Sequence, residues 1–340
     1  MTDQSESKNT LHELATNVLQ EYDIVPEELS VIQGGSIKTV WKFSYNNSLY
    51  CLKRLKQPLD KVLFSANAQI YIKKSGGNVP GIILNKFSDP ITAFNDQLFI
   101  VYEWLSGRDL NFSNRQDLSL AIEGLAKFHA ASKGYSAMAG ARVSSKLGKW
   151  PNQYESMMNK LTSWKELAGA KSGPQHRAYL ACVDGILDLA AQALALLEKS
   201  KYSELTMEGS DAPVLCHQDY GKGNALLTAE GVYVIDLDGV TFDLPSRDLR
   251  KIIGKIAENR NRWDIRSTED VLLWYSNINK ISEEEKKVLY IDLLFPHWFF
   301  GLVKNQYDKL KDIKAAEIER ITRLELSKAP VIRELLEKQY

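Results

Sequence analysis

Two neighbouring segments, VLCHQDYGKGNALL (residues 214–227) and VYVIDLD (residues 232–238), decide the fold of this chain. The first carries Asp219 and Asn224 five residues apart on one loop, and the second is an apolar strand that ends on Asp236. Phosphoryl transfer needs a carboxylate that accepts the proton of the attacking hydroxyl, and oxygen ligands that hold Mg²⁺ against the phosphates. The pattern therefore predicts Asp219 as the catalytic base and Asn224 and Asp236 as magnesium ligands.

Each of these polar residues also has a plainer structural interpretation. Taken singly, His217 is more often a hydrogen-bonded core histidine, Asn224 a turn residue and Asp236 a cap. The fixed spacing of the set favours a functional site, because an unpaired carboxylate at the end of an apolar strand is costly. We assign His217 a structural role that orients the loop, since its neighbours already supply the base and the metal ligands.

Three upstream segments fit a nucleotide site. Gly34-Gly35-Ser36 forms a turn before a strand, and its backbone N–H groups could cover phosphate. Lys53 lies on an apolar strand from which an ammonium group can reach the phosphates of a nucleotide. The segment FIVYEWLSG (residues 99–107) offers a backbone edge for adenine. Together with the loop of Asp219, these segments predict that the chain binds ATP and Mg²⁺.

Hydrophobic periodicity divides the chain into a β-rich first part and a mainly helical second part. After a leading helix at 11–22, the first part shows strand patterns at 29–32, 40–45, 49–55, 82–87 and 97–104, with one helix at 60–74 and a turn at Asn46-Asn47. Helical patterns then follow at 118–131, 154–167, 175–199 and 247–263. We therefore expect an N-terminal lobe at residues 1–104, which binds the nucleotide, and a larger C-terminal lobe at residues 105–340.

The order of these features resembles the aminoglycoside phosphotransferase and choline kinase superfamily. It runs from the glycine turn through the strand lysine and E-W-L-x-G (103–107) to H-x-D-x-x-x-x-N (217–224) and I-D-L-D (235–238). Within that superfamily, HQDYG (217–221), DLDG (236–239) and DLPSRDLRK (243–251) most resemble bacterial spore coat proteins of the CotS type. The resemblance implies a two-lobed α+β fold like that of protein kinases, with an N-terminal antiparallel sheet, one crossing helix and a mainly helical C-terminal lobe.

The resemblance also implies roles for single residues. Lys53 would contact the phosphates, and the backbones of Glu103 and Leu105 would bind adenine. Asp248 would open the following helix and hold the catalytic loop by hydrogen bonds, a structural role shared with His217. The adenine slot would be lined by four apolar side chains, namely Val40, Cys51, Leu226 and Ile235.

Two departures from the pattern bear on activity. Kinases pair the strand lysine with a glutamate on the crossing helix, but residues 61–74 contain no acidic residue, and Gln69 lies about where the partner is expected. A neutral amide orients a lysine less strongly than a carboxylate does. Only about a dozen residues separate Asp236 from the helix near Asp248, which leaves little room for a protein substrate. The acceptor is therefore expected to be a small hydroxyl compound, with Asp238 and Lys222 facing it.

Two functions stay open. The first is an ATP- and Mg²⁺-dependent phosphotransferase that acts on a small-molecule hydroxyl and is associated with the spore coat. The second is a catalytically weak or inactive structural component of the coat that keeps the kinase-like fold. A third, metal-dependent hydrolysis, is disfavoured because the five histidines are scattered, at His12, His129, His176, His217 and His297.

Composition limits the partners and the location. Lys+Arg and Asp+Glu number 43 each, so no net basic field attracts nucleic acid or anionic lipid. Residues 1–10 lack the cationic start and apolar run of a signal peptide, and charge interrupts the longest apolar segments. We expect cytoplasmic synthesis without a signal peptide, no membrane contact and, if the resemblance holds, deposition on the spore coat through other coat proteins.

Two further features have no role in this scheme. Cys51, Cys182 and Cys216 lie far apart in apolar surroundings and are expected to be buried thiols in a reducing compartment. The aromatic stretch FPHWFF (residues 295–300) is either part of the core of the helical lobe or a contact surface, and core is favoured.

Overall fold

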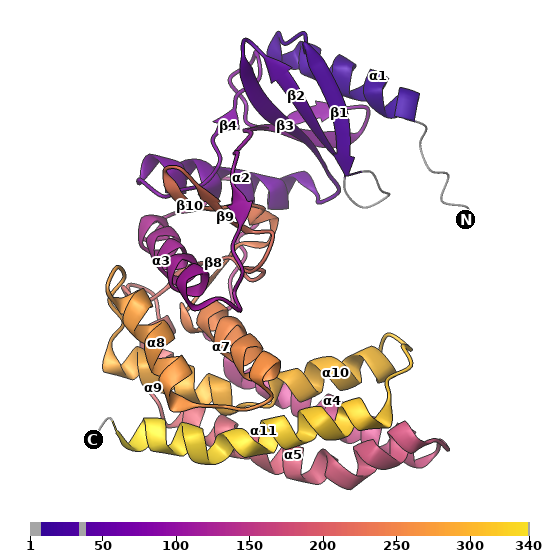
Figure 1. Cartoon of the computed structure of the whole chain (residues 1–340), viewed down its shortest axis with the longest axis vertical. Helices are drawn as coiled ribbons and strands as arrows, with labels where there is room; N and C mark the ends of the chain where they lie inside the picture. Colours follow the sequence, from indigo (N-terminus) through magenta and orange to yellow (C-terminus); the bar gives the residue numbers. More distant parts are fainter. Residues whose placement is uncertain (1–7, 34–38, 339–340) are drawn as a thin grey trace. The chain divides into compact units, whose positions relative to one another are not determined.

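The computed structural model describes residues 8–33 and 39–338. Gly34, Gly35 and Ser36, predicted to cover phosphate, lie outside the described residues. Contacts divide the chain into two compact units, whose elements are labelled in Figure 1. The first unit comprises residues 1–111, 124–144 and 219–241, and the second comprises residues 112–123, 145–218 and 242–340.

The first unit contains a six-stranded antiparallel sheet. Its strand order is β1-β2-β3-β6-β4, and β5 also pairs with β6. Asn46 and Asn47 both have positive φ, of 50° and 58°, and join β2 to β3 in the left-handed conformation that a two-residue hairpin requires. The strands are β1 (Glu28–Gln33), β2 (Thr39–Tyr45), β3 (Ser48–Leu55), β4 (Ile82–Ile83), β5 (Thr92–Phe94) and β6 (Gln97–Glu103).

One strand prediction is wrong in length. The pattern at 82–87 forms a strand only at Ile82–Ile83, because the chain turns at Asn85, whose side chain accepts hydrogen bonds from the N–H groups of Phe87 and Asp89. Asx turns of this kind end strands by offering the backbone a local partner. The chain then re-enters the sheet as β5, which the sequence patterns did not predict.

Helices cover this sheet and complete its core. The leading helix α1 (Lys8–Leu19), continued by η1 (Gln20–Tyr22), packs with the fully buried Trp41, whose indole Nε1 donates to the Leu11 carbonyl at 3.1 Å. The crossing helix α2 (Leu59–Lys74) buries Val62 and Ala66 against Leu55 and Ile100 of the sheet. The sheet and its two helices thus carry Lys53, Glu103 and their neighbours on a rigid scaffold.

A second, three-stranded sheet in the first unit carries the chemical motif. Its order is β10-β9-β7, formed by β10 (Gly231–Val234), β9 (Ala225–Thr228) and β7 (Arg108–Asp109). Because β9 pairs with β7, residues 219–241 belong to the same unit as the N-terminal sheet. The compact unit therefore differs from the lobe expected at residues 1–104, and one of the boundaries between the units falls within α3 (Arg115–Ser132).

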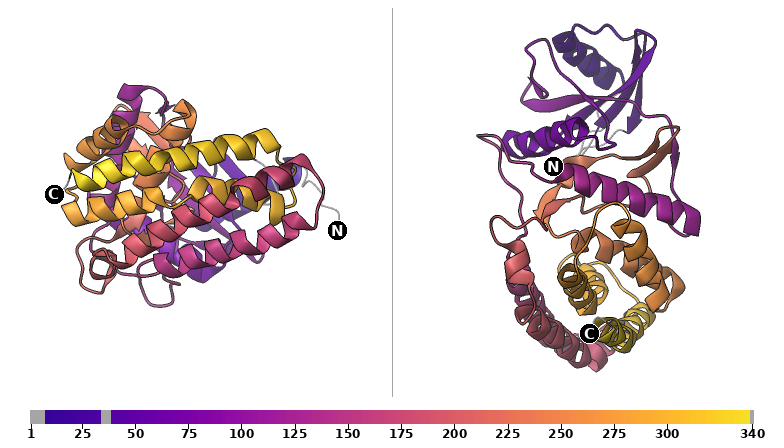
Figure 2. Two further views of the ribbon diagram at one scale, coloured as in Figure 1. Left: turned by 90° about the horizontal axis from the view of Figure 1, so that it is seen from below. Right: turned by 90° about the vertical axis from the view of Figure 1, so that its left-hand side faces the viewer.

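Among the described residues of the second unit, the regular secondary structure is helical apart from the short strands β8 (Val214–Cys216) and β11 (Thr241–Asp243). Figure 2 shows its long helices lying side by side, and α5 packs against α4, α9 and α11. The helices are α4 (Trp150–Gly169), α5 (Pro174–Glu198), α6 (Tyr202–Thr206), α7 (Ser246–Arg260), α8 (Ile265–Ser276), α9 (Glu283–Leu294), α10 (His297–Tyr307) and α11 (Ala315–Glu337).

Helix α5 is the one helix in the described ranges that is long and apolar enough to cross a membrane by length and composition. Its sequence includes Asp184, which pairs with Lys165 of α4 at 2.6 Å. Its buried side chains, among them Tyr179, Val183 and Ile186, contribute to the core of the second unit. We therefore interpret α5 as a core helix.

Candidate functional site

A cavity of about 460 Å³ opens in the first unit between the two sheets. All four side chains predicted to form an adenine slot, Val40, Cys51, Leu226 and Ile235, line it. Pro80, Tyr102 and Leu237 extend the apolar wall, although sequence patterns did not single them out. Its volume and apolar lining are typical of a small-molecule pocket.

The three cysteines were expected to be buried thiols. Cys51 and Cys182 are half-buried, and of the three only Cys216 is fully buried.

The segment at residues 99–107, predicted to bind adenine through its backbone and here called the hinge, forms one side of this cavity. Glu103 and Leu105 both line it, and the Glu103 carboxylate accepts hydrogen bonds from the Gly81 N–H at 2.7 Å and from Lys73 Nζ at 3.1 Å. A Cβ atom on Gly81 would lie 2.6 Å from the Glu103 carboxyl carbon, so this approach requires glycine. The Glu103 side chain therefore positions the hinge, while adenine recognition by its backbone stays a prediction.

Lys53 lies at the polar end of the cavity and has two acidic partners. Its Nζ lies 2.8 Å from Asp236 Oδ1 and 2.5 Å from Asp238 Oδ1, and its side chain is 7% exposed. Burial alone would lower the pKa of Lys53, but the charges of Asp238 and Asp236 outweigh it and hold the pKa above its ordinary value. Lys53 is therefore a cation at neutral pH, with a fixed position.

The crossing helix supplies no acid to Lys53, but this does not leave Lys53 without a carboxylate partner. Helix α2 does contain one acidic residue, Asp60, but its carboxylate pairs with Arg142 at 2.6 Å. Gln69, the expected substitute partner, is buried and donates from Nε2 to the Pro80 carbonyl at 2.7 Å. In the structure, Lys53 is oriented by carboxylates from the segment that follows β10.

The three charged groups carry a net charge of −1, because two carboxylates face one ammonium group. A cluster of hard oxygen atoms with this balance attracts a divalent cation. Asp236 adopts the left-handed conformation, with φ 65°, which is uncommon for a residue with a side chain and occurs often at functional sites. Asp238, predicted to face the acceptor, pairs with Lys53, and its role toward the acceptor stays a prediction.

Two hydrogen bonds link Asn224, on the loop after β8, to the backbone of Asp219 and to the residue before Asp236. Asn224 donates from Nδ2 to the Asp219 carbonyl at 2.9 Å, so its amide oxygen is the atom able to coordinate a cation. The Ile235 N–H donates to the Asn224 carbonyl at 3.1 Å, which ties the loop to the residue before Asp236. Asn224 and Asp236 line the cavity, whereas Asp219 and Lys222 are exposed.

In the second unit, Asp248 holds the start of this loop. It lies in the first turn of α7, is 1% exposed, and accepts hydrogen bonds from the N–H groups of His217 at 2.6 Å and Gln218 at 2.8 Å. Lys251 donates to the Gln218 carbonyl as well. Gln218 has φ 69°, so these bonds hold an uncommon backbone conformation directly before Asp219.

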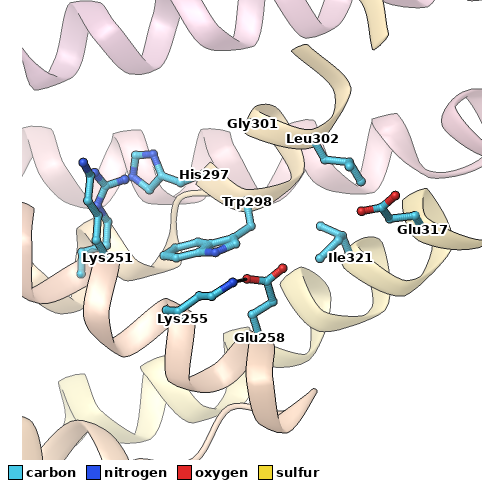
Figure 3. Close-up of a pocket in the computed structure, with 10 residues that line it drawn as sticks. Lys251, Lys255, Glu258, His297, Trp298, Gly301, Leu302, Glu317 and Ile321 are labelled. Carbon is cyan, nitrogen blue, oxygen red and sulfur yellow. Dashed lines mark hydrogen bonds and ion pairs between the residues drawn. The ribbon is translucent and has the colours of Figure 1, made fainter. Parts of the chain in front are cut away.

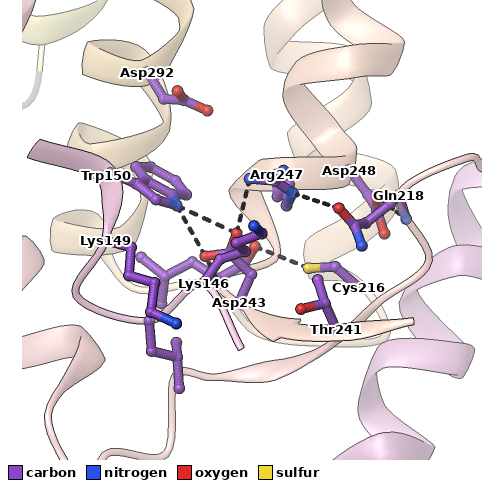
Figure 4. A network of polar contacts seen from close by, with 12 residues as sticks. Lys146, Lys149, Trp150, Cys216, Gln218, Thr241, Asp243, Arg247, Asp248 and Asp292 are labelled. Atoms are coloured by element: carbon purple, nitrogen blue, oxygen red, sulfur yellow. Dashed lines mark hydrogen bonds and ion pairs between the residues drawn. The ribbon is translucent and has the colours of Figure 1, made fainter. Parts of the chain in front are cut away.

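Next to these contacts lies a buried network centred on Asp243 (Figure 4). The indole Nε1 of Trp150 lies 3.0 and 3.2 Å from the two carboxylate oxygens, and the Leu244 N–H donates at 2.9 Å. Arg247 bridges the network to the loop, since it donates to Asp243 at 3.2 Å and to the Gln218 side chain at 3.3 Å. Sequence patterns placed Asp243 in the motif DLPSRDLRK (243–251) but gave it no role. Its hydrogen-bond partners in the folded chain reveal that role.

Asp243 gives the stability of the protein a predictable dependence on pH. Burial raises the pKa of Asp243 from 3.8 to about 6, although Arg247, the Leu244 N–H and Trp150 oppose the rise. A raised carboxyl pKa means that the folded state binds the proton more tightly, so the contribution of this group to stability is complete below pH 4 and is lost as the pH rises through 6. Two pKa units correspond to about 3 kcal/mol.

We therefore expect the stability advantage of the wild type over Asp243→Asn to shrink by about 2–3 kcal/mol between pH 4 and pH 7, measured by urea unfolding. Asp264→Asn is the matched control. Although burial opposes it, hydrogen bonds from Ser267 and the charge of Arg260 lower the pKa of Asp264, so its contribution to stability is lost only below about pH 4 and its profile should be nearly flat between pH 4 and pH 7. Parallel pH profiles for the two variants would contradict the prediction.

Solved structures with the same architecture establish the fold. The structure is similar to an aminoglycoside phosphotransferase from Alicyclobacillus acidocaldarius, with a TM-score of 0.76 and 17% identity over 95% of this chain and 96% of that one. It is also similar to the amicoumacin kinase hAmiN, solved in complex with AMP-PNP and Ca²⁺, with a TM-score of 0.61 and 15% identity over 97% of each chain. These likenesses confirm the predicted kinase-like phosphotransferase fold of the α+β class.

Sequence comparison agrees with the resemblance to spore coat proteins. The chain is 23% identical to spore coat protein S of Bacillus subtilis (strain 168) over 300 residues, which cover 88% of this chain and 86% of the relative. The model of the family described as "Spore coat putative kinase YutH" matches residues 15–336. With nearly its whole length matched, the chain belongs to this spore coat family.

Proposed function

We propose that this protein is an ATP- and Mg²⁺-dependent phosphotransferase that acts on a small-molecule hydroxyl and is associated with the spore coat. One observation carries the proposal. The apolar cavity of the first unit ends at a buried ammonium group held between two carboxylates, Asp236 and Asp238, with the Asn224 amide also in its wall. An apolar slot that leads to a cation and to hard oxygen ligands fits a nucleoside triphosphate with its metal ion.

Each residue has a defined task in this scheme. The adenine ring occupies the slot formed by Val40, Cys51, Leu226 and Ile235 and meets the backbone of Glu103 and Leu105. Lys53 would bind the phosphates, and the Asn224 amide oxygen and the Asp236 carboxylate would hold Mg²⁺, which would neutralise charge on the transferred phosphoryl group. Asp219, on the exposed loop, accepts the proton of the attacking hydroxyl.

Lys53 must exchange partners when a nucleotide binds. Phosphate oxygens would compete with the two carboxylates for its ammonium group, and a bound metal ion would neutralise the charge of Asp236. That exchange releases Asp238, which together with the exposed Lys222 is then available to the acceptor.

The second candidate is a kinase-like component of the spore coat with weak or no turnover. Two observations favour it. The helix α2 supplies no acid to Lys53, whose ammonium group instead pairs with Asp238 and with Asp236, the carboxylate needed for the metal ion. The relative that matches 88% of this chain is named spore coat protein S. In this case the protein reaches the coat through other coat proteins.

Calorimetric titration with ATP, with and without Mg²⁺, tests the proposal. We expect Mg²⁺ to strengthen ATP binding by the wild type, and Asp236→Ala to lose at least about tenfold in affinity in the presence of Mg²⁺, because one metal ligand is gone. Asp219→Ala should keep nucleotide binding, while transfer to a panel of small alcohols falls by about 10²–10⁴-fold.

Glu28→Ala, which removes an exposed carboxylate from β1, is the control and should leave both measurements unchanged. If the wild type binds no nucleotide with or without Mg²⁺, the phosphotransferase proposal is wrong. If it binds nucleotide but transfers phosphate to no acceptor, and Asp219→Ala behaves like the wild type, the second candidate is favoured.

A further inference from the structure

A second cavity, of about 540 Å³, lies in the second unit (Figure 3). Side chains from α7, α10 and α11 line it, and it shares no lining residue with the cavity that Lys53 lines. The proposed phosphotransferase mechanism does not use it. Its lining combines an aromatic ring and aliphatic side chains with several charged groups, a combination that suits a small charged organic molecule.

The lining has an excess of positive charge. Three cations, Arg250, Lys251 and Lys255, line the cavity together with two carboxylates, Glu258 and Glu317. Arginine, lysine and glutamate side chains are ordinarily charged at neutral pH, so the lining carries a net charge of +1. Electrostatics therefore favour an anionic ligand over a neutral or a cationic one.

Two ion-pair partners outside the lining leave this excess unchanged. Arg320 lies 3.6 Å from Glu258, and Asp292 lies 3.0 Å from Arg250, so they add one charge of each sign. Although burial alone would raise it, the Arg250 guanidinium holds the pKa of Asp292 well below its ordinary range. Burial, together with the charge of Arg250, lowers the pKa of His297 to about 3, so this lining residue is neutral and adds no charge.

Arg250 is a buried lining residue whose donors are poorly satisfied. It is only 8% exposed, and Asp292 is its one ion-pair partner among residues 8–33 and 39–338. The two atoms that pair, Arg250 Nε and Asp292 Oδ2, are buried, and neither has a hydrogen-bond partner in these residues. A guanidinium carries five N–H donors, and a buried donor without an acceptor costs free energy. Arg250 therefore favours a ligand that brings acceptor atoms into the cavity.

The charges are separated along the cavity. Figure 3 shows Lys251 and His297 at one end, Glu317 at the other end and Trp298 between them. Arg250 belongs to the end of His297, because both side chains contact the same buried carboxylate. Glu317 lies in the first turn of α11, where the helix dipole stabilises a negative charge. The end that holds Arg250 and Lys251 is called the cationic end below.

Trp298 provides an apolar surface beside the cationic end. Within the aromatic stretch 295–300, Phe295 and Phe299 are fully buried, whereas Trp298 is partly exposed and its ring lies among the lining side chains. Most of the stretch is therefore core, as favoured from the sequence, but this ring reaches the cavity. One side of the indole packs on α7 at Gly254, where an added Cβ would lie 1.8 Å from Trp298 Cη2.

We propose that this cavity binds a small organic monocarboxylate with an aromatic body. Its carboxylate accepts hydrogen bonds from Arg250 and Lys251 at the cationic end, and its ring packs on Trp298 towards Leu302 and Ile321. One negative charge neutralises the excess of the lining. A dianion such as a phosphate monoester would leave the site negative beside the two lining carboxylates, which disfavours it.

Calorimetry on the full chain at pH 8, without ATP, tests the proposal with four probes that share a phenyl ring. Benzoate is a monoanion, benzyl alcohol is neutral, benzylamine is a cation and phenyl phosphate is a dianion at this pH. We expect benzoate to bind with a Kd of about 1 mM. Benzyl alcohol and benzylamine should bind at least about tenfold more weakly, and phenyl phosphate at least about threefold more weakly.

A cavity-filling variant locates the binding site. Gly301 of α10 lines the cavity, and an added Cβ at this position would meet no atom within 4 Å, so a side chain can be placed there without damage to the core. Gly301→Leu should weaken benzoate binding at least about tenfold. Gly185→Leu is its matched control, because Gly185 is also an exposed mid-helix glycine of the second unit and does not line the cavity, and it should bind like the wild type.

An arginine variant tests the recognition of the carboxylate. Arg250→Lys keeps the positive charge but removes the planar set of N–H donors, and it should weaken benzoate binding at least about fivefold. Arg260→Lys is its matched control, since Arg260 is also in α7 and pairs with a carboxylate, that of Asp264 at 3.2 Å, but does not line the cavity. Urea unfolding of both variants checks that they are folded.

Four outcomes would overturn the proposal. The first is that benzoate does not bind at concentrations up to about 20 mM, well above the expected Kd. The second is that any of the other three probes binds as tightly as benzoate. The third and fourth are that Gly301→Leu binds benzoate as well as Gly185→Leu, or that folded Arg250→Lys binds it as well as Arg260→Lys. Because the readout is binding without ATP, the result does not depend on the proposed phosphotransferase activity.

Discussion

Replacing Glu325 with alanine is expected to lower the free energy of unfolding by about 3–5 kcal/mol. Glu325 and Lys328 form an ion pair in α11, and both residues are 0% exposed. Glu325 Oε1 also accepts hydrogen bonds from the N–H groups of Trp298 at 2.8 Å and Phe299 at 3.0 Å, in the first turn of α10 where no intrahelical partner exists. Alanine would leave these donors unsatisfied and Lys328 without its carboxylate.

If the ion pair is lost, Lys328 becomes energetically unfavourable in either of its protonation states. Burial already lowers its pKa, and the Glu325 charge opposes that decrease. Without Glu325, the ammonium group must either stay charged in the core or release its proton, and both states are unfavourable relative to the unfolded chain. Urea unfolding monitored by fluorescence measures the loss directly.

A set of variants separates the contributions at this site. Glu325→Gln keeps an acceptor for the α10 N–H groups but removes the charge, whereas Glu325→Gln with Lys328→Met also removes the cation. We expect the double variant to recover most of the stability lost in the single one, since a buried ion pair can be replaced by neutral groups at little cost. Glu319→Ala, an exposed change in the same helix, should stay within about 0.5 kcal/mol of the wild type. A loss below about 1 kcal/mol in Glu325→Ala would show the prediction to be wrong.

Asp248→Ala is expected to cost about 2–4 kcal/mol, because it leaves the buried N–H groups of His217 and Gln218 without the acceptor that they share. Asp248→Asn should cost less, since one amide oxygen can still accept a hydrogen bond. The loss falls on the segment directly before Asp219, so hydrogen exchange at the amides of His217 and Gln218 should become faster together with the decrease in stability. Hydrogen exchange of these two amides and urea unfolding are the measurements.

Asp264→Ala provides the matched control for this change. Asp264 caps α8, also in the second unit, by accepting from the Ser267 N–H at 2.8 Å, and loss of a helix cap costs about 1 kcal/mol. That variant should lower global stability without a selective effect on the amides of His217 and Gln218. Equal exchange at these amides in both variants would mean that Asp248 stabilises the helix rather than the loop.

Local sequence patterns predicted much of the fold and the composition of the candidate site. The two-residue turn at Asn46-Asn47, the helical periods and the spacing of Asp219 and Asn224 depend on interactions within a few residues, which a pattern records directly. The strand at 82–87 was predicted too long because the side chain of Asn85 ends it, a local competition that hydrophobic alternation does not reveal.

The sequence by itself thus determined which chemical groups this protein has and the secondary structure that carries most of them. Only the tertiary structure decided which groups meet. Lys53 pairs with Asp236 and Asp238, more than 180 residues away, rather than with the crossing helix. Sequence patterns also did not predict that Glu325 and Lys328 are buried or that Trp298 is partly exposed. The physical reason is that burial and charge pairing depend on which distant segments pack together, and the free energy of that packing is a property of the whole chain.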